Sequence, residues 1–318
     1  MEMLKVALYL IGGGAVLSWG ANLFVDSASH IARRFGISPV IIGLTVVAFG
    51  TSAPELAVNV LASSQGNVDI AMGNVVGSNI FNIAFILGIC TIISPLFVSS
   101  QLIRIDIPIM VFSSGLLWFM ASNQIISSME GFILCAGIVG YILLQIKLAT
   151  SGKNAEQEFE KEFSGTGRPV KDFAILVGGL VCLVVGAKFF VDGAVLGARL
   201  LGMSEAVIGL TIIAAGTSLP EVATSVAATV KGERDIAIGN VVGSNIFNIL
   251  AVIGISSLIS GKGMPVNLHM ATVDCAVMFV IAFLCLPFSI WRKQLDRPLG
   301  FVLFFSWILY TWYLIIEA

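Results

Sequence analysis

Ten stretches of the sequence are almost continuously apolar, and each is long enough to cross a lipid bilayer as a helix. A transmembrane helix needs roughly 20 mostly apolar residues, whereas the strands of a membrane barrel alternate apolar and polar residues. No such alternation is present, so we expect an all-α membrane protein with ten transmembrane helices. The ten expected helices are Leu4–Phe24, Val40–Ala62, Ile70–Ile93, Ile105–Met120, Met129–Leu148, Phe173–Val191, Ala206–Ala228, Ile236–Ile259, Ala271–Phe288 and Leu299–Ile316.

The few charged residues predict how the chain is oriented and divided. Only 11% of the residues are charged, and most of the 17 lysines and arginines lie on or beside the odd-numbered connections between the expected helices. By the positive-inside rule these connections face the cytoplasm, which places both termini outside the cell membrane. The longest connection, residues 149–172, is polar and is expected to be a cytoplasmic linker between a first unit, 1–148, and a second unit, 173–318.

The two units are copies of one another. An offset of 166 residues aligns Leu10–Ser94 with Leu176–Ser260 without a gap, and roughly half of the aligned positions are identical. Each copy holds five expected helices, and an odd number makes the second copy enter the membrane from the opposite side. We therefore expect two inverted five-helix repeats, an architecture that secondary transporters use for alternating access to a site at the bilayer midplane.

The hexapeptide GTSAPE places a glycine, a proline and an ionisable side chain inside the second expected helix. Gly50 weakens a helix and Pro54 removes a backbone donor, so we expect the helix to break here. The carbonyls of Ala48 and Thr51 should then lose their helical partners, and in a membrane they need an electropositive partner instead. The second copy, GTSLPE, repeats the pattern in the seventh expected helix with Ala214, Thr217 and Glu221.

A simple kink with a protonated, hydrogen-bonded glutamate is the plainest alternative explanation of each hexapeptide. It is disfavoured because an ionisable residue deep in a membrane-spanning helix costs a few kcal/mol. Lys188 lies near the end of its expected helix and can extend to the membrane surface instead of neutralising a glutamate. A bound cation would satisfy the glutamates and the freed carbonyls together.

A second motif, GNVVGSNIFNI, occurs twice without any difference, once in each copy. Its polar residues are four apart and therefore share one helix face. We expect the serines to contact an ion, whereas the first asparagine of each copy could equally hydrogen-bond to a neighbouring helix. The two glycines form a G-x-x-x-G pattern that permits close approach of another helix. The polar residues are Asn74, Ser78 and Asn82 in the first copy and Asn240, Ser244 and Asn248 in the second.

Together these segments gather two carboxylates with hydroxyl, amide and backbone oxygens. Ca²⁺ takes about six to eight oxygen ligands, carboxylates included. Two carboxylates balance one Ca²⁺ and can equally be balanced by Na⁺ or protons, so one site can serve competing ions in turn, as in an antiporter. His30 and His269 lie near helix ends, and the five cysteines show no C-x-x-C spacing, so we expect no cofactor, disulfide or transition-metal site.

Over its whole length the chain resembles a prokaryotic member of the sodium/calcium exchanger family, within the cation/calcium antiporter superfamily. The resemblance is carried by GTSAPE and GTSLPE, each followed by GNVVGSNIFN, on ten expected helices. It implies that the second, third, seventh and eighth helices form the ion-binding core. It also implies that the first and sixth helices slide across this core to switch access.

The resemblance further implies a set of ligands. The calcium site would comprise Glu55 and Glu221 with the backbone carbonyls of Thr51 and Thr217. Relatives often carry an acidic residue at the position of Asn248, the potassium-dependent ones in particular, so potassium coupling is not expected here. The remaining candidate ligands, for sodium and for the centre of the site, are Ser52, Ser218, Ser78, Ser244, Asn82, Asn248 and the carbonyls of Ala48 and Ala214.

The leading interpretation is Na⁺/Ca²⁺ antiport by a monomer whose partners are membrane lipid and inorganic cations, with no nucleic acid. An antiporter of protons against Ca²⁺ or another divalent cation is the nearest alternative, because a glutamate pair can also exchange protons. We rank it second. A cation channel is the rival from another class, since oxygen-lined pores exist, although inverted repeats with broken helices favour a transporter. An intramembrane protease would leave the symmetric serines, threonines and asparagines without a role, so no enzymatic activity is expected.

Overall fold

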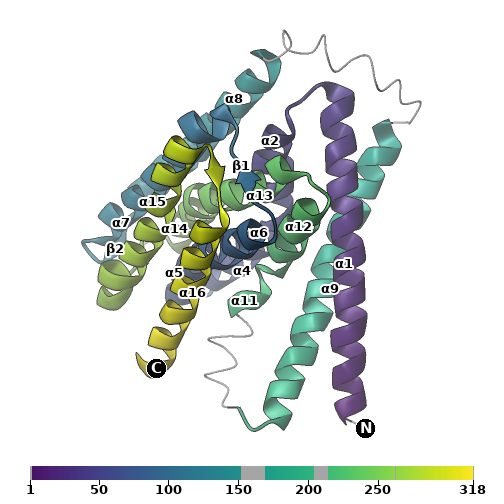
Figure 1. The fold of residues 1–318 in the computed structure, drawn as a ribbon. Coiled ribbons are helices and arrows are strands. Elements are labelled where there is room, and N and C mark those ends of the chain that lie inside the picture. Colours follow the sequence, from purple (N-terminus) through teal and green to yellow (C-terminus); the bar gives the residue numbers. More distant parts are fainter. Residues whose placement is uncertain (1, 152–168, 204–213, 262, 318) are drawn as a thin grey trace.

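The computed structural model describes residues 2–151, 169–203, 214–261 and 263–317, and it is almost entirely helical (Figure 1). In this described part, eight helical stretches are long and apolar enough to cross a membrane, and the bent pair Pro39–Thr51 and Ala53–Ser64 makes a ninth candidate. The expected seventh helix, Ala206–Ala228, lies partly outside the described residues. The fold class is thus all-α with many candidate spans.

The helices follow in two series of similar order, and short π-helical turns, labelled η, interrupt them. The first series is α1 (Glu2–Phe35), α2 (Pro39–Ile42), η1 (Gly43–Val47), α3 (Ala48–Thr51), α4 (Ala53–Ser64), α5 (Val68–Ile80), η2 (Phe81–Leu87), α6 (Gly88–Ile93), η3 (Leu102–Asp106), α7 (Ile107–Ala121) and α8 (Ser128–Ser151). The second is α9 (Pro169–Leu200), α11 (Ala214–Gly216), α12 (Leu219–Val230), α13 (Arg234–Phe247), η6 (Asn248–Ile253), α14 (Gly254–Ser260), η7 (Met270–Asp274), α15 (Cys275–Arg292) and α16 (Arg297–Glu317).

Two helices are longer than the hydropathy pattern indicates. α1 continues past Phe24 to Phe35, and α9 begins at Pro169 and continues past Val191 to Leu200. The additional turns carry polar and charged side chains, which a hydropathy pattern excludes from a span although they continue the helix. Of the expected linker, residues 152–168 lie outside the described residues.

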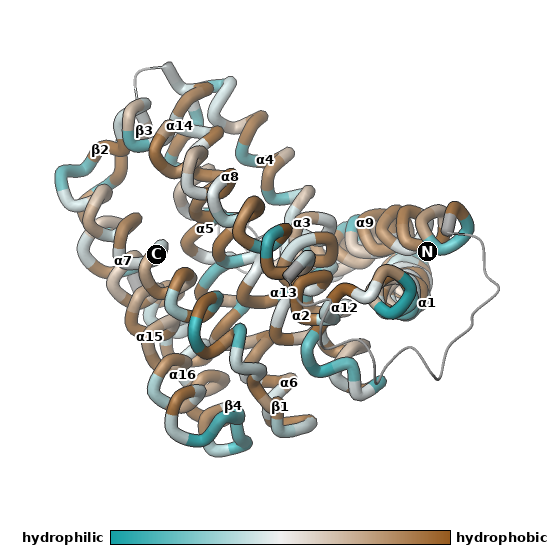
Figure 2. Tube along the Cα trace, turned by 90° about the horizontal axis from the view of Figure 1, so that it is seen from above, coloured by the Kyte–Doolittle hydropathy of each residue, from teal (hydrophilic) through white to brown (hydrophobic). Residues whose placement is uncertain are grey.

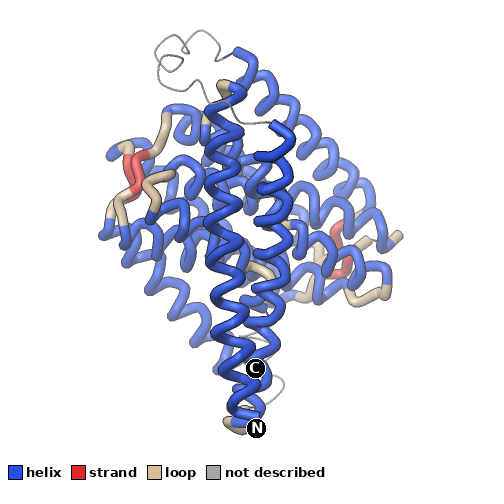
Figure 3. The backbone as a smooth tube through the Cα atoms, turned by 90° about the vertical axis from the view of Figure 1, so that its right-hand side faces the viewer, coloured by secondary structure: helices blue, strands red, loops and turns tan. Residues whose placement is uncertain are grey.

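α1 and α9 run side by side as a long antiparallel pair at one edge of the molecule (Figures 1 and 3). Glycines allow their backbones to approach. A Cβ atom on Gly13 would lie 2.5 Å from the backbone nitrogen of Phe190, and one on Gly186 would lie 2.5 Å from that of Leu17. Larger residues at either position would force the two helices apart.

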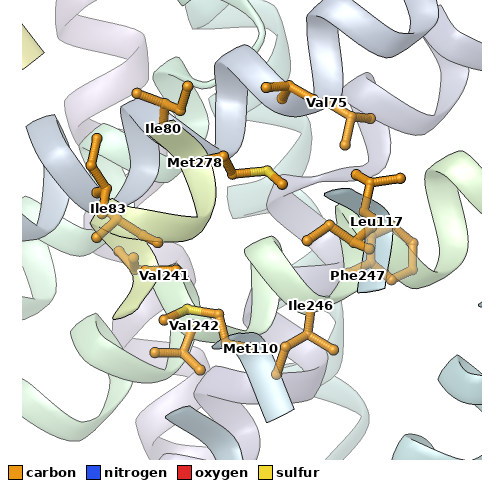
Figure 4. Packing of buried hydrophobic residues seen from close by; sticks show 14 of the residues in the cluster. Val75, Ile80, Ile83, Met110, Leu117, Val241, Val242, Ile246, Phe247 and Met278 are labelled. Atoms are coloured by element: carbon orange, nitrogen blue, oxygen red, sulfur yellow. The ribbon is translucent and has the colours of Figure 1, made fainter. Parts of the chain in front are cut away.

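α13 lies at the centre of the remaining helices. An 18-residue stretch within Arg234–Ser260 is completely buried, compared with 72% of the corresponding stretch within Val68–Ile93. Figure 2 shows apolar residues over most helical turns and polar residues mainly at helix ends and connections. Figure 4 shows part of the apolar packing around α13, which includes Val75, Ile80, Ile83, Met110, Leu117, Val241, Val242, Ile246, Phe247 and Met278.

Two very short antiparallel strand pairs join the halves of the chain. β1 (Leu96–Phe97) pairs with β4 (Gln294–Leu295), and β2 (Ile125–Ile126) pairs with β3 (Met264–Pro265). Figure 1 places both termini at one end of the molecule. The last turn of α8 and the first turn of α9 lie at the other end.

Candidate cation-binding site

Both proline-containing hexapeptides interrupt a helix, as expected. Ser52, with φ −85° and ψ 5°, separates α3 from α4, and the chain bends by 45° there. Ser218, with φ −87° and ψ 6°, precedes α12 in the same way. The repeated sequence therefore produces the same local backbone in both copies.

One detail of the expected break is wrong. The carbonyl of Ala48 keeps a helical partner, because it accepts the N–H of Ser52 at 3.0 Å. The carbonyl of Gly50 also receives a backbone N–H at the end of α3, although the residue four positions later is Pro54, which has no N–H of its own. In the second copy, Ala214 is the first residue of α11 and directly follows residues 204–213, which lie outside the described residues.

The two glutamates are fully buried in the first turns of α4 and α12, and each is held from the other repeat. The hydroxyl of Ser218 donates to Oε1 of Glu55 at 3.1 Å, and the hydroxyl of Ser52 donates to Oε1 of Glu221 at 2.9 Å. The other oxygen of each carboxylate, Oε2, is buried without a hydrogen-bond partner among the described residues. Acids that are 166 positions apart in sequence therefore contribute to one buried site.

The threonines beside the breaks also bind across the two repeats. The hydroxyl of Thr51 donates to Oδ1 of Asn240 at 3.0 Å, and that of Thr217 donates to Oδ1 of Asn74 at 3.3 Å. Of the two roles considered for these asparagines, the structure shows the hydrogen bond between helices.

The serines and the last asparagines of the repeated motif add neutral oxygens to the site. The hydroxyl of Ser218 also accepts the hydroxyl of Ser78 at 3.1 Å, because the single hydrogen of Ser218 is used on Glu55. The repeat equivalent, Ser244, is fully buried, as are Asn82 and Asn248. The hydroxyl of Ser244, both amide atoms of Asn82 and Oδ1 of Asn248 have no partner among the described residues. Buried polar atoms are nearly always paired, so a group of unpaired buried oxygens is typical of a place that binds water or an ion.

Two buried residues outside the motifs extend this network. Asn74 donates to Oδ1 of Asn59 at 2.8 Å, and Asn240 donates to the hydroxyl of Ser225 at 2.9 Å. The sequence analysis missed Asn59 and Ser225. Each stands four residues after a site glutamate, on the same helix face, and that spacing could have revealed them.

Asn79 is a third residue that the sequence analysis missed. It is 1% exposed, and its Oδ1 accepts the amide of Asn248 at 3.1 Å, while its own amide donates to the carbonyl of Asn245 at 3.3 Å. The bond fixes the orientation of the Asn248 side chain and leaves Oδ1 of that residue as an acceptor. Asn79 belongs to the repeated motif but lies off the face shared by the other polar residues.

The glycines of the second motif copy bring α13 against η1 and α3. A Cβ on Gly239 would lie 3.0 Å from the Cα of Gly43, and one on Gly243 would lie 2.6 Å from a backbone oxygen of η1. The expected close approach is therefore present in this copy. Around Gly77 no described atom lies within 4 Å of such a Cβ, and the segment equivalent to η1 falls in residues 204–213, outside the described part.

The charge of the site comes from its carboxylates. None of the ion pairs found between described residues includes Glu55 or Glu221. The described residues also contain no cluster of three or more His, Cys, Asp or Glu side chains that could hold a metal ion. Two carboxylates among neutral oxygens suit a hard cation and do not suit a metal that prefers sulfur or imidazole.

Comparison with known proteins agrees with this chemistry. The family model described as sodium/calcium exchanger protein matches residues 5–147 and 171–316. The chain belongs to this family. It is therefore a multi-pass membrane protein of a transporter family, and the two matched segments leave out the whole connection between α8 and α9.

Individual family members are similar over nearly the whole chain. The inner membrane protein YrbG of Escherichia coli is 37% identical, with 98% of both chains covered. The sodium/calcium exchanger MaX1 of Methanosarcina acetivorans is 34% identical, with 95% of this chain and 96% of the relative covered. A structure of the sodium-calcium exchanger NCX_Mj soaked with Na⁺ and Sr²⁺ is 31% identical, with a TM-score of 0.84 over 97% of this chain and 98% of that one.

Proposed function

We propose that the chain exchanges Ca²⁺ for Na⁺ by alternating access to the site between Glu55 and Glu221. The observation that carries the proposal is the reciprocal pairing of each glutamate with a serine of the other repeat, which leaves one oxygen of each carboxylate free. Two buried carboxylates supply the charge that balances one Ca²⁺, and several Na⁺ ions can balance the same pair using the surrounding neutral oxygens.

The proposed ligands are those expected from the sequence. They are Glu55, Glu221, Ser52, Ser218, Ser78, Ser244, Asn82, Asn248 and the carbonyls of Thr51, Thr217, Ala48 and Ala214. The carbonyl of Ala48 has a second lone pair beyond the one used by Ser52, so it can still serve.

The proposed architecture is ten transmembrane helices in two inverted five-helix repeats, 1–148 and 173–318, joined by a cytoplasmic linker. Matching breaks, matching π-helical turns at η2 and η6, and cross-repeat hydrogen bonds support the repeat. We place both termini outside the cell and expect a monomer surrounded by lipid.

Flux from proteoliposomes tests the coupling ion. Vesicles that contain the purified chain and are loaded with Na⁺ should take up Ca²⁺ when placed in a sodium-free medium, and sodium-free vesicles should not. Uptake driven by a pH gradient without sodium would instead identify a proton antiporter. Flux that needs no counter-ion and does not saturate would identify a channel.

The Asn79→Leu variant should weaken exchange because the side chain of Asn248 would no longer be held in its orientation. The substitution removes the acceptor that holds the Asn248 amide, and a lost hydrogen bond of about 0.5–1.5 kcal/mol corresponds to a rise in the KM for Ca²⁺ of about two- to tenfold. Asn245→Leu is the matched control, since among the described residues the side chain of Asn245 makes only a long 3.8 Å contact from its amide to the sulfur of Met110. Equal KM values in the two variants would contradict the positioning role.

A further inference from the structure

Two ion pairs connect the last turns of α1 to the turn between α12 and α13. Nζ of Lys231 donates to Asp26 at 2.6 Å, and the guanidinium of Arg33 donates to Oε1 of Glu233 at 2.7 Å. The hydroxyl of Ser29, which is 3% exposed, donates to the same glutamate oxygen at 2.7 Å. These contacts join the first repeat to the second at the end of the molecule where α1 finishes.

The other end of the molecule cannot form the same contacts. The 166-residue offset relates Asp26 and Arg33 of α1 to Asp192 and Arg199 of α9. It relates Lys231 and Glu233, however, to Gln65 and Asn67 in the turn between α4 and α5, which are neutral. The turn between α12 and α13 therefore carries charges opposite to those of Asp26 and Arg33, whereas the equivalent turn between α4 and α5 carries a neutral residue at each of the two matching positions.

The two long helices also sit differently on the core. A Cβ on Gly50, at the end of α3, would lie 3.1 Å from the ring of Phe24 of α1. At the equivalent Gly216 the nearest atom, at 2.7 Å, belongs to Val191 of α9, although the repeat equivalent of Phe24 is Phe190. The two equivalent glycines thus meet side chains that are not equivalent, so the two long helices contact the core differently.

We propose that the Lys231–Asp26 and Arg33–Glu233 pairs form a one-sided latch that favours the conformation in which α1 is closed against the turn between α12 and α13. The proposal rests on the proposed alternating access. In alternating access by inverted repeats, each repeat takes up the conformation that the other had before. The contact of α1 with the second repeat must then become like the contact that α9 now makes with the first repeat. The latch must then break, and the neutral turn between α4 and α5 offers no replacement pair.

The latch makes the two conformations unequal in energy. The paired side chains are partly exposed, from 22% for Glu233 to 55% for Asp26, so each pair contributes modestly. Together they should shift the ratio of the two conformations by about two- to tenfold. The latched end is the one that we propose faces the cytoplasm, so the latch keeps the cytoplasmic entrance closed.

Charge exchange across one pair tests the latch. Asp26→Lys and Lys231→Asp each break the pair, and the double variant restores it with the charges reversed. Asp192→Lys is the matched control, because it makes the same change on α9, where the equivalent partner is Gln65. The KM for Ca²⁺ is measured from each side in right-side-out and inverted membrane vesicles. Each single variant should lower KM on the latched side and raise it on the other by about two- to tenfold, and the double variant should return both values toward wild type.

A second measurement does not depend on transport. Hydrogen exchange of the backbone amides of residues 231–235 should be faster in both single variants and restored in the double variant, and Asp192→Lys should leave it unchanged. Unchanged amide exchange in the single variants would overturn the latch, and so would KM values that move in the same direction on both sides. If wild-type vesicles show no Ca²⁺ exchange, the proposed function fails, and the amide exchange still decides whether the latch exists.

Discussion

Replacing either Glu55 or Glu221 by glutamine should abolish most Ca²⁺ exchange. Glutamine keeps an oxygen that can accept the serine hydroxyl, so the fold around Ser52 and Ser218 should survive, but each substitution removes one of the two charges that balance the ion. Removing one partner of a buried charge pair costs about 2–5 kcal/mol, which corresponds to a loss of about 30- to 4000-fold in exchange. The measurement is sodium-driven Ca²⁺ uptake by proteoliposomes.

Glu130→Gln is the control for this pair of variants. Glu130 lies at the start of α8, where its carboxylate accepts the N–H and the hydroxyl of Ser127 at 2.7 and 2.8 Å. Glutamine can accept in the same capping arrangement, so uptake should stay at the wild-type rate. Near-normal uptake in either the Glu55 or the Glu221 variant would show that the ion does not bind between the two glutamates.

The helix breaks and the buried polar residues around them were predictable because they follow from local sequence motifs. A glycine and a proline flanking an acid inside an apolar run are enough to predict a helix break, and the structure has the breaks at Ser52 and Ser218. Duplication then shows that two such breaks exist. The spacing of the repeated polar residues placed Ser78 and Asn82 on one face, and both are buried.

Features that depend on contacts between the repeats were not predictable in this way. No local pattern shows that Ser52 would bind Glu221 rather than the nearby Glu55, because that depends on where the two copies meet. The added turns of α1 were missed for a related reason. Asp26 and Arg33 interrupt the apolar pattern, yet both lie within α1, and charged partners on the second repeat bind them.

Placing one methyl group at Gly243 should destabilise the centre of the molecule. A Cβ there would lie 2.6 Å from the carbonyl oxygen of Leu44 and 2.7 Å from the Cβ of Ala48. Backbone atoms cannot rotate away as a side chain can, so α13 would have to separate from α3. We expect Gly243→Ala to lower the free energy of unfolding by about 1–3 kcal/mol and to lower the Tm in detergent. It should also slow exchange, because the bond from Thr51 to Asn240 joins the same two helices.

The same substitution at Gly178 should not destabilise the protein. Gly178 lies on α9 with no atom within 4 Å of an added Cβ, so alanine meets no obstacle there. Alanine forms helix more readily than glycine by about 1 kcal/mol, and Gly178→Ala should therefore leave the Tm unchanged or raise it. If Gly243→Ala were as stable as Gly178→Ala, α13 could not be packed as tightly against α3 as the glycine distances require. The cross-repeat bonds that position the two glutamates would then need another explanation.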